Sequence, residues 1–222
     1  MSSRFRTFNG TKRNTFGKRR YSGYRNFTKP SSSLDISLLV KKASLSLEVN
    51  EFEIINSFNS FNVTQELKNN ISAKGYSIPT PIQDRAIPIL LEGKDVVGIA
   101  NTGTGKTAAF LIPILEKIHN NRTNKALIVA PTRELASQIY EECRSFTKNL
   151  GIQAALCIGG VGLYGQKQAL RNNPNIVIGT PGRLKDLNNQ RCLNFANYNL
   201  IVLDEVDRML DMGFIHDVKF II

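Results

Sequence analysis

Five short apolar runs, rich in β-branched residues, are the feature that most constrains how this chain can fold. They span residues 95–100, 126–130, 154–158, 175–179 and 200–204. Strands this apolar are typically buried on both faces, as in a parallel sheet covered by helices. The stretches between them, 106–119, 133–149, 164–172 and 182–189, carry helical patterns. This alternation predicts a doubly wound α/β domain, in which ligands bind at the carboxyl ends of the strands.

Two further helices are expected before the first apolar run. Residues 64–74 form a helical pattern that Thr64 can cap and Gly75 can close. The next helix begins at Pro81 and runs to Glu92.

The basic residues gather at the N-terminus of the 222-residue chain. Residues 1–42 hold 11 of the 29 lysines and arginines and a single acid, Asp35, whereas 43–222 hold 18 bases and 17 acids. The net charge of +11 therefore belongs to a tail. Residues 1–33 contain no acid, Leu, Ala or Ile, so they are expected to be disordered when free. We predict a disordered tail and linker over 1–42 and a folded domain over 43–222.

The role of this tail stays open between three alternatives. Its phenylalanines and tyrosines are interleaved with Arg, Lys and Gly, which suits single-stranded RNA, because cations contact phosphates and rings stack on bases. A solubilising tail is the second alternative. The third is an organelle presequence, although three glycines and the lack of Leu, Ile and Ala argue against its amphipathic helix.

Composition excludes several other classes of protein. No stretch approaches the roughly 18 unbroken apolar residues of a membrane span, and the N-terminus lacks the apolar core of a secretory signal. The three cysteines, Cys143, Cys157 and Cys192, are odd in number and far apart, which argues against a disulfide framework or a zinc site. Such cysteines suit a reducing compartment, and we expect a cytoplasmic protein.

A glycine-rich loop follows the first apolar run. It reads Ala100-Asn101-Thr102-Gly103-Thr104-Gly105-Lys106-Thr107 and leads into a helical stretch. Glycines let backbone N–H groups turn inward around phosphate oxygens, and a helix N-terminus adds partial positive charge. Lys106 can then reach the β- and γ-phosphates, and the Thr107 hydroxyl can bind Mg²⁺. The pattern predicts a nucleoside triphosphate site made of Thr102, Gly103, Thr104, Gly105, Lys106 and Thr107, although Ala100 stands where the usual pattern has Gly.

An acidic pair, Asp204 and Glu205, ends the last apolar run. At the end of a buried strand Asp204 can hold Mg²⁺, directly or through water, and Glu205 can orient and deprotonate an attacking water. We therefore predict Glu205, Lys106 and Asp204 as catalytic residues. A GTPase is disfavoured, because Asn124-Lys125 lacks the acid of an Asn-Lys-x-Asp motif.

In order along the chain, these residues and their neighbours resemble the first RecA-like domain of a DEAD-box ATP-dependent RNA helicase, over roughly residues 57–222. Gly75-Tyr76 and Pro79-Thr80-Pro81-Ile82-Gln83 resemble the Q motif, with Phe58 at its upstream aromatic position. Residues 100–107 match motif I, 131–136 motif Ia, Gly159-Gly160 the glycine pair and 180–183 motif Ib. Asp204-Glu205-Val206-Asp207 matches motif II. Six ordered motifs make the resemblance specific.

The resemblance implies an adenine site. Gln83 would pair its amide with N6 and N7 of adenine and so select ATP over GTP, and Phe58 would stack on the same base. A phenylalanine of the core is the alternative for Phe58. The implied cofactors are ATP and Mg²⁺.

The resemblance also implies an RNA path. Its sugar–phosphate contacts would come from Arg133, Gly160, Thr180 and Arg183. Contacts of this kind do not read sequence, so the implied partner is RNA of broad sequence. A salt bridge to a neighbouring acid is the alternative for Arg133.

Two departures from the family pattern bear on activity. Val206 replaces the Ala of Asp-Glu-Ala-Asp, for which we expect a modest effect. The sequence ends at Ile222, before the Ser-Ala-Thr motif, whose strand in this family lies between the phosphate-loop strand and the Asp-Glu strand. We interpret the chain as part of a longer helicase with a second RecA-like domain, and expect feeble or no ATP turnover from it alone. A non-catalytic RNA-binding or annealing fragment is the alternative.

Overall fold

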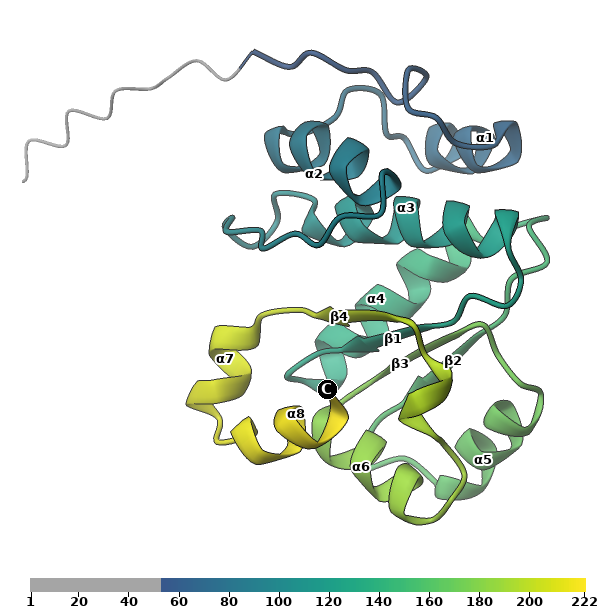
Figure 1. The fold of residues 1–222 in the computed structure, drawn as a ribbon, viewed down its shortest axis with the longest axis vertical. Helices are drawn as coiled ribbons and strands as arrows, with labels where there is room; N and C mark the ends of the chain where they lie inside the picture. The colour runs from purple at the N-terminus through teal and green to yellow at the C-terminus, as the bar shows by residue number, and fades with distance from the viewer. Residues whose placement is uncertain (1–52) are drawn as a thin grey trace, which may run out of the picture. The chain divides into compact units, whose positions relative to one another are not determined.

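The computed structural model of the chain describes residues 53–222 (Figure 1). The predicted tail and linker, and the domain boundary expected after residue 42, lie outside these residues. In chain order the helices are α1 (Gln65–Ala73), α2 (Pro81–Leu91), α3 (Lys106–Asn120), α4 (Arg133–Phe146), α5 (Leu163–Arg171), α6 (Pro181–Asn189), the 3₁₀ turn η2 (Phe195–Asn197), α7 (Val206–Asp211) and α8 (Ile215–Ile221). The strands are β1 (Ala126–Val129), β2 (Ala154–Cys157), β3 (Ile176–Gly179) and β4 (Leu200–Leu203).

The four strands form one sheet in the order β2-β3-β1-β4, and every neighbouring pair is parallel. The register aligns Val129 of β1 with Gly179 of β3 and with Leu203 of β4, and it aligns Gly179 with Cys157 of β2. The strands therefore end level with one another. The inner strands, β1 and β3, are buried along their whole length.

Helices lie on both faces of the sheet (Figure 1). Alternate residues of the strands belong to two separate apolar clusters, one on each face. The first face carries Ala126, Ile128, Ile176 and Ile178 and packs against helices α1 to α4. The second carries Leu127, Val129, Ala155 and Val177 and packs against helices α5 to α8. The predicted doubly wound α/β domain is confirmed. Within residues 53–222, no helix is both long enough and apolar enough to span a bilayer.

One predicted strand is absent from this sheet. Residues 95–100 form no strand, and the side chains of Val97 and Ile99 are 93% and 95% exposed. A strand needs a neighbour that pairs with its backbone groups, and no strand among the described residues pairs with this segment. The prediction of a buried strand over 95–100 is therefore wrong for this structure.

The predicted burial of both faces is also wrong for β4. This strand pairs with β1 on one side only, and its Ile201 side chain is 44% exposed. It is an edge strand, so its outer backbone groups have no partner in the sheet.

Two buried carboxylates fasten the segment before α1 to the helices beneath it. Asp84 of α2 accepts hydrogen bonds from the backbone N–H groups of Ile55 and Asn56, at 3.3 and 2.8 Å. Glu116 of α3 accepts one from the backbone N–H of Thr64 at 2.8 Å. Because charge-assisted hydrogen bonds are the stronger ones, these contacts set the path of residues 55–64 across the helices.

Candidate nucleotide and RNA site

The loops that carry the predicted acidic pair and the predicted RNA-contacting residues leave the sheet at one edge. The backbone ladder extends one residue past the aligned strand ends: Ala130 N–H donates to Gly179 O at 3.0 Å, Thr180 N–H to Cys157 O at 3.1 Å, and Asp204 N–H to Val129 O at 2.9 Å. The residues that follow the four strands therefore start level. This alignment brings the predicted acidic pair and the predicted RNA-contacting residues to a common edge.

The phosphate loop has the left-handed turns that its glycines allow. Gly103 and Gly105 have φ values of +81° and +87°, and helix α3 begins at Lys106. The Lys106 ammonium donates a hydrogen bond to the Ala100 carbonyl at 2.6 Å, across the mouth of the loop. The N-terminal N–H groups of a 15-residue helix thus open onto the loop, an arrangement suited to binding phosphate.

Gln83 lies behind this loop with its side chain fully buried. Its amide nitrogen donates to the Gly105 carbonyl at 3.0 Å, and its amide oxygen accepts from the Thr80 N–H at 2.9 Å. A Cβ atom at position 105 would collide with the Gln83 amide. The glutamine therefore ties the start of α2 to the phosphate loop.

Phe58 lies in the apolar core next to α2. Its side chain is 5% exposed, and its ring makes edge-on contacts with Phe61 and Tyr76 at centroid distances of 5.8 and 5.7 Å. Tyr76 in turn donates to Glu142 of α4 at 2.6 Å. This environment matches the core alternative for Phe58.

Asp204 and Glu205 stand at the end of β4. Asp204 is 8% exposed, and burial raises the pKa of its carboxyl; the nearby Lys106 charge works against this rise, and Glu205 adds to it. The Lys106 ammonium and the Asp204 carboxylate are thus close enough to interact, as a shared nucleotide site requires. Glu205 has left-handed backbone angles, φ +49° and ψ +52°, where α7 begins.

The oxygen donors at this edge fit a hydrated Mg²⁺ ion. Among residues 53–222 there is no cluster of three or more His, Cys, Asp or Glu side chains arranged to hold a metal. Mg²⁺ commonly keeps several waters and binds one or two protein oxygens together with substrate phosphates. The Thr107 hydroxyl and the Asp204 carboxylate are donors of that kind, so the fit requires a bound triphosphate.

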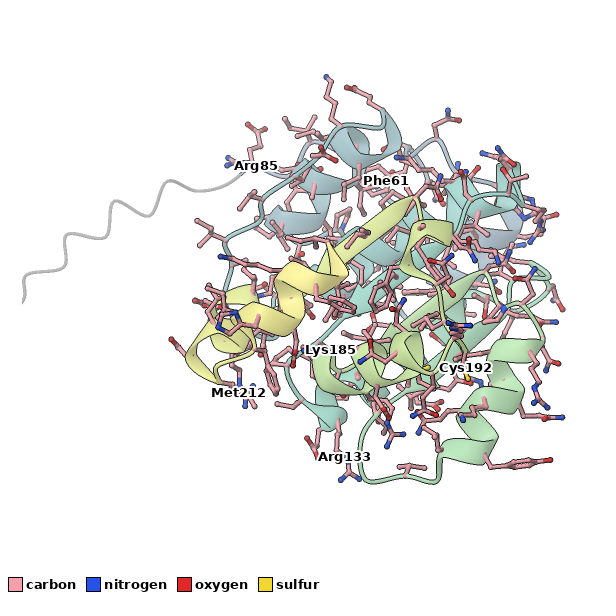
Figure 2. All side chains as sticks on the ribbon, turned by 60° about the horizontal axis from the view of Figure 1, so that its bottom comes forward. Phe61, Arg85, Arg133, Lys185, Cys192 and Met212 are labelled. Carbon is pink, nitrogen blue, oxygen red and sulfur yellow. The ribbon has the colours of Figure 1, made fainter. Side chains whose placement is uncertain are left out.

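The predicted RNA-contacting residues share the edge beyond β2, β1 and β3. Arg133 is exposed at the start of α4 (Figure 2). Its guanidinium lies against Gly160, where φ is +71° and a Cβ atom would collide with it. In the part of the chain that the structure describes, Arg133 forms no ion pair, so the salt-bridge alternative finds no support there.

Thr180 and Arg183 belong to the turn that starts α6. Thr180 is the residue before the first helical position, Pro181. The Arg183 guanidinium donates to the Val161 carbonyl at 3.3 Å and lies 3.9 Å from the Asp186 carboxylate. Arg183 thereby joins the loop after β2 to the helix after β3.

The sequence alone assigns no role to one neighbour of Asp204 and Glu205. Arg208 of α7 donates to the Glu205 carboxylate at 3.1 Å, and Glu205 keeps only 14% of its side chain exposed. The spacing of three residues on a helix start was the available signal, but it is common among surface residues. Arg208 thus gives the Glu205 carboxylate a charged partner next to the phosphate site.

Comparison with known protein families agrees with this geometry. The model of the DEAD/DEAH box helicase family matches residues 80–222. The chain is 46% identical over 166 residues to the DEAD-box ATP-dependent RNA helicase CshA of Bacillus subtilis, across 74% of this chain and 34% of that protein. CshA of Streptococcus pneumoniae gives 46% identity, 74% of this chain and 32% of that protein. The chain thus spans about a third of the length of these curated relatives.

Two solved structures share the fold. A crystal structure of a DEAD box protein from Methanococcus jannaschii matches with a TM-score of 0.70 at 44% identity, over 73% of this chain and 45% of that one. A hypothetical ATP-dependent RNA helicase from Sulfolobus tokodaii matches with a TM-score of 0.67 at 38% identity, over 72% and 46%. The RecA-like fold predicted from the motifs is confirmed, and the chain belongs to the DEAD/DEAH box helicase family.

Proposed function

We propose that the chain supplies the ATP site and half of the RNA track of an ATP-dependent RNA helicase. The observation that carries this proposal is the common edge of the sheet, where Lys106, Asp204 and Glu205 lie beside a phosphate loop and Arg133 and Arg183 follow the neighbouring strands. The curated relatives are named as RNA helicases of this kind.

In the ATP site, backbone N–H groups of residues 102–107 hold the phosphates and Lys106 neutralises their charge. Thr107 and Asp204 would hold the Mg²⁺ that accompanies ATP, and the ion would supply positive charge against the charge developing on the phosphates. Glu205 orients the attacking water and accepts its proton. The contact with Arg208 supports that role, because a cationic partner favours the ionised carboxylate of Glu205.

Gln83 forms the adenine end of this site, and Phe58 would stack on the base only after leaving its core contacts with Phe61 and Tyr76. Gln83 has one amide hydrogen and one oxygen lone pair beyond its bonds to Gly105 and Thr80, and these can pair with adenine. Because Gln83 and Phe58 are both buried, nucleotide binding includes a movement that uncovers them. Residues 75–83 act in this account as the Q motif.

On the RNA side, Arg133 and Arg183 contact phosphates with their guanidinium groups. Thr180 adds a hydroxyl, and Gly160 offers bare backbone. These contacts position any single strand without reading its bases. A second RecA-like domain completes the RNA cleft and the ATP site, so closure of the two domains makes hydrolysis depend on RNA.

The cellular compartment that fits best is the cytoplasm. Cys143, Cys157 and Cys192 are free thiols in the structure. Free thiols persist in reducing compartments.

Lys106→Ala tests the catalytic proposal. In the native protein we expect it to reduce RNA-stimulated phosphate release at least 100-fold, because the charge on the β- and γ-phosphates is no longer met. Lys148→Ala, at an exposed lysine just after the end of α4, is the matched control and retains activity. Unchanged phosphate release in Lys106→Ala would contradict the proposal that the protein hydrolyses ATP at this site. RNA binding without any nucleotide hydrolysis in the unaltered protein would favour the non-catalytic RNA-binding fragment.

A further inference from the structure

The loop after β2 presents an aromatic side chain to solvent. Tyr164, in the first turn of α5, is 79% exposed, and Val161 in the same loop is 49% exposed. Tyr164 makes no hydrogen bond, ring stack or cation contact with any residue in 53–222. The other described tyrosines are engaged or covered: Tyr76 donates to Glu142, Tyr140 lies under Arg144 and Tyr198 is buried. An exposed tyrosine with no contact within the fold has its ring faces available to a ligand.

The backbone around Tyr164 is bare. Gly159, Gly162 and Gly165 lie on either side of Val161 and Tyr164, and a Cβ atom at any of them would meet nothing within 4 Å. Gly182, at the start of α6, is equally open. A flat ligand can therefore approach this loop closely, without side chains in the way.

The loop is held rigidly and lies beside cations. Gln166, buried in α5, donates to the Ile158 carbonyl at 3.0 Å and fixes the base of the loop. Arg183 donates to the Val161 carbonyl in its middle, and the Arg133 guanidinium lies against Gly160. The same two arginines are the proposed phosphate contacts. An exposed ring on a fixed loop next to phosphate-binding cations is the arrangement that binds single-stranded nucleic acid.

We propose that Tyr164 is a stacking platform for one unpaired base of the RNA strand whose phosphates contact Arg133 and Arg183. The proposal rests on the proposed RNA-binding function and adds a base contact to a track otherwise made of backbone contacts. Every base has a π-face, so this contact adds affinity for unpaired strands without specifying sequence. Because bases in a duplex are already stacked, Tyr164 favours the single strand.

The first experiment compares the full chain with Tyr164→Leu and Tyr164→Phe on two probes, a single-stranded uridine oligonucleotide and an abasic oligonucleotide of the same length. We expect Tyr164→Leu to bind the uridine strand at least about five-fold more weakly, with unchanged binding to the abasic strand. Tyr164→Phe, which keeps the ring, binds both as the unaltered chain does. Equal binding of all three proteins to the uridine strand, or an equal loss on both probes, overturns the stacking contact.

Arg133→Ala separates this inference from the proposed function. It removes a phosphate contact, so it weakens binding to both probes. If Arg133→Ala weakens binding and Tyr164→Leu does not, the RNA track stands and the platform fails. If the unaltered chain binds neither probe, both proposals fail.

A second measurement reads the contact directly and does not depend on affinities from other parts of the chain. Irradiation of the full chain bound to a 5-iodouridine oligonucleotide joins the base to an aromatic ring stacked on it, and mass spectrometry of the digested protein locates the adduct. We expect an adduct on Tyr164. Adducts found solely on other residues overturn the proposal.

Discussion

At the scale of single residues, the structure uses two buried carboxylates in opposite ways. Asp84 is 3% exposed and receives two backbone N–H groups. Asp204 is 8% exposed and has its pKa raised by burial. Hydrogen bonds within the fold compensate the first carboxylate, whereas the charged form of the second is buried at a cost in stability.

Asp204→Asn should therefore stabilise the nucleotide-free chain. The raised pKa means that the folded state disfavours the charged carboxyl, by about 1.4 kcal/mol for each unit of the shift at pH values above the folded pKa. The neutral amide removes this cost, and we expect the Tm at pH 7 to rise by about 2–4 °C for each kcal/mol recovered. Thermal unfolding followed by circular dichroism measures this change in Tm. A lower Tm for Asp204→Asn would contradict a stability cost from the buried charge. The same substitution should abolish ATP hydrolysis by the native protein.

Asp84→Asn should destabilise the chain in a pH-dependent way. Burial alone would raise the pKa of Asp84, but the N–H groups of Asn56 and Ile55 and the nearby Arg85 outweigh it and hold the pKa below its usual value. This carboxylate thus stabilises the fold above the unfolded pKa of about 3.9, and the stabilisation is lost as the pH falls through the folded pKa. We expect a loss of about 1–3 kcal/mol at pH 7, measured by urea unfolding.

The same series measured at lower pH checks the origin of that loss. The difference between Asp84→Asn and the unaltered chain should shrink as the pH falls below 4. Asp211→Asn, at an exposed acid of α7, is the control and should differ little at any pH. A loss for Asp84→Asn that does not change with pH would show that shape, not charge, matters at this position.

At the scale of helices and strands, the sequence correctly predicts the features that depend on local pattern, namely where helices begin and the burial of the inner strands. The starts of α2 at Pro81 and α3 at Lys106 follow from proline and glycine chemistry, and the β1 and β3 runs are buried as expected. The strand predicted over 95–100 does not form in this structure. Its apolar residues favour burial, but a strand also needs a neighbouring strand to pair with its backbone groups. The bonds from Gln83 to Gly105 and from Arg183 to Val161 join residues about 20 apart in sequence, and no local pattern encodes them.

The exposure of residues 95–99 predicts that substitutions there have little effect on stability. The double substitution Val97→Ser, Ile99→Ser should change the free energy of unfolding of this chain by less than about 0.5 kcal/mol per site, because both side chains are already in water. Ile128→Ala, in the fully buried β1, is the contrasting variant and should cost about 2–5 kcal/mol. Urea unfolding of both variants compares the two; a large loss from the serine pair would place residues 95–100 inside a core.

At the scale of the whole chain, charge and fold are separated along the sequence. The part from 43 onward is nearly neutral, with 18 bases and 17 acids, and it carries the proposed RNA track. Its affinity for RNA therefore depends on a few placed arginines. The tail segment 1–33 adds nine basic residues and no acid to this chain.

Deleting residues 1–33 should consequently change the salt dependence of RNA binding. The slope of log affinity against log salt is about 0.7 for each phosphate neutralised on a single strand, so removal of nine cations should make it shallower by up to about 6. Fluorescence anisotropy with a labelled oligonucleotide at several salt concentrations measures this slope. Unchanged affinity and slope would leave the tail as a solubilising or targeting segment.

The order of strands in the sheet also predicts how strongly the amide protons of each strand are protected from exchange with solvent. Strands β1 and β3 have partners on both sides and are buried, whereas β2 and β4 have a partner on one side, and β4 is partly open to water. Exchange with deuterium should therefore be slowest in β1 and β3, and faster in β4. Asp204 and Glu205 follow β4, so we expect this acidic pair, which we propose to be catalytic, to lie on the least protected side of the sheet.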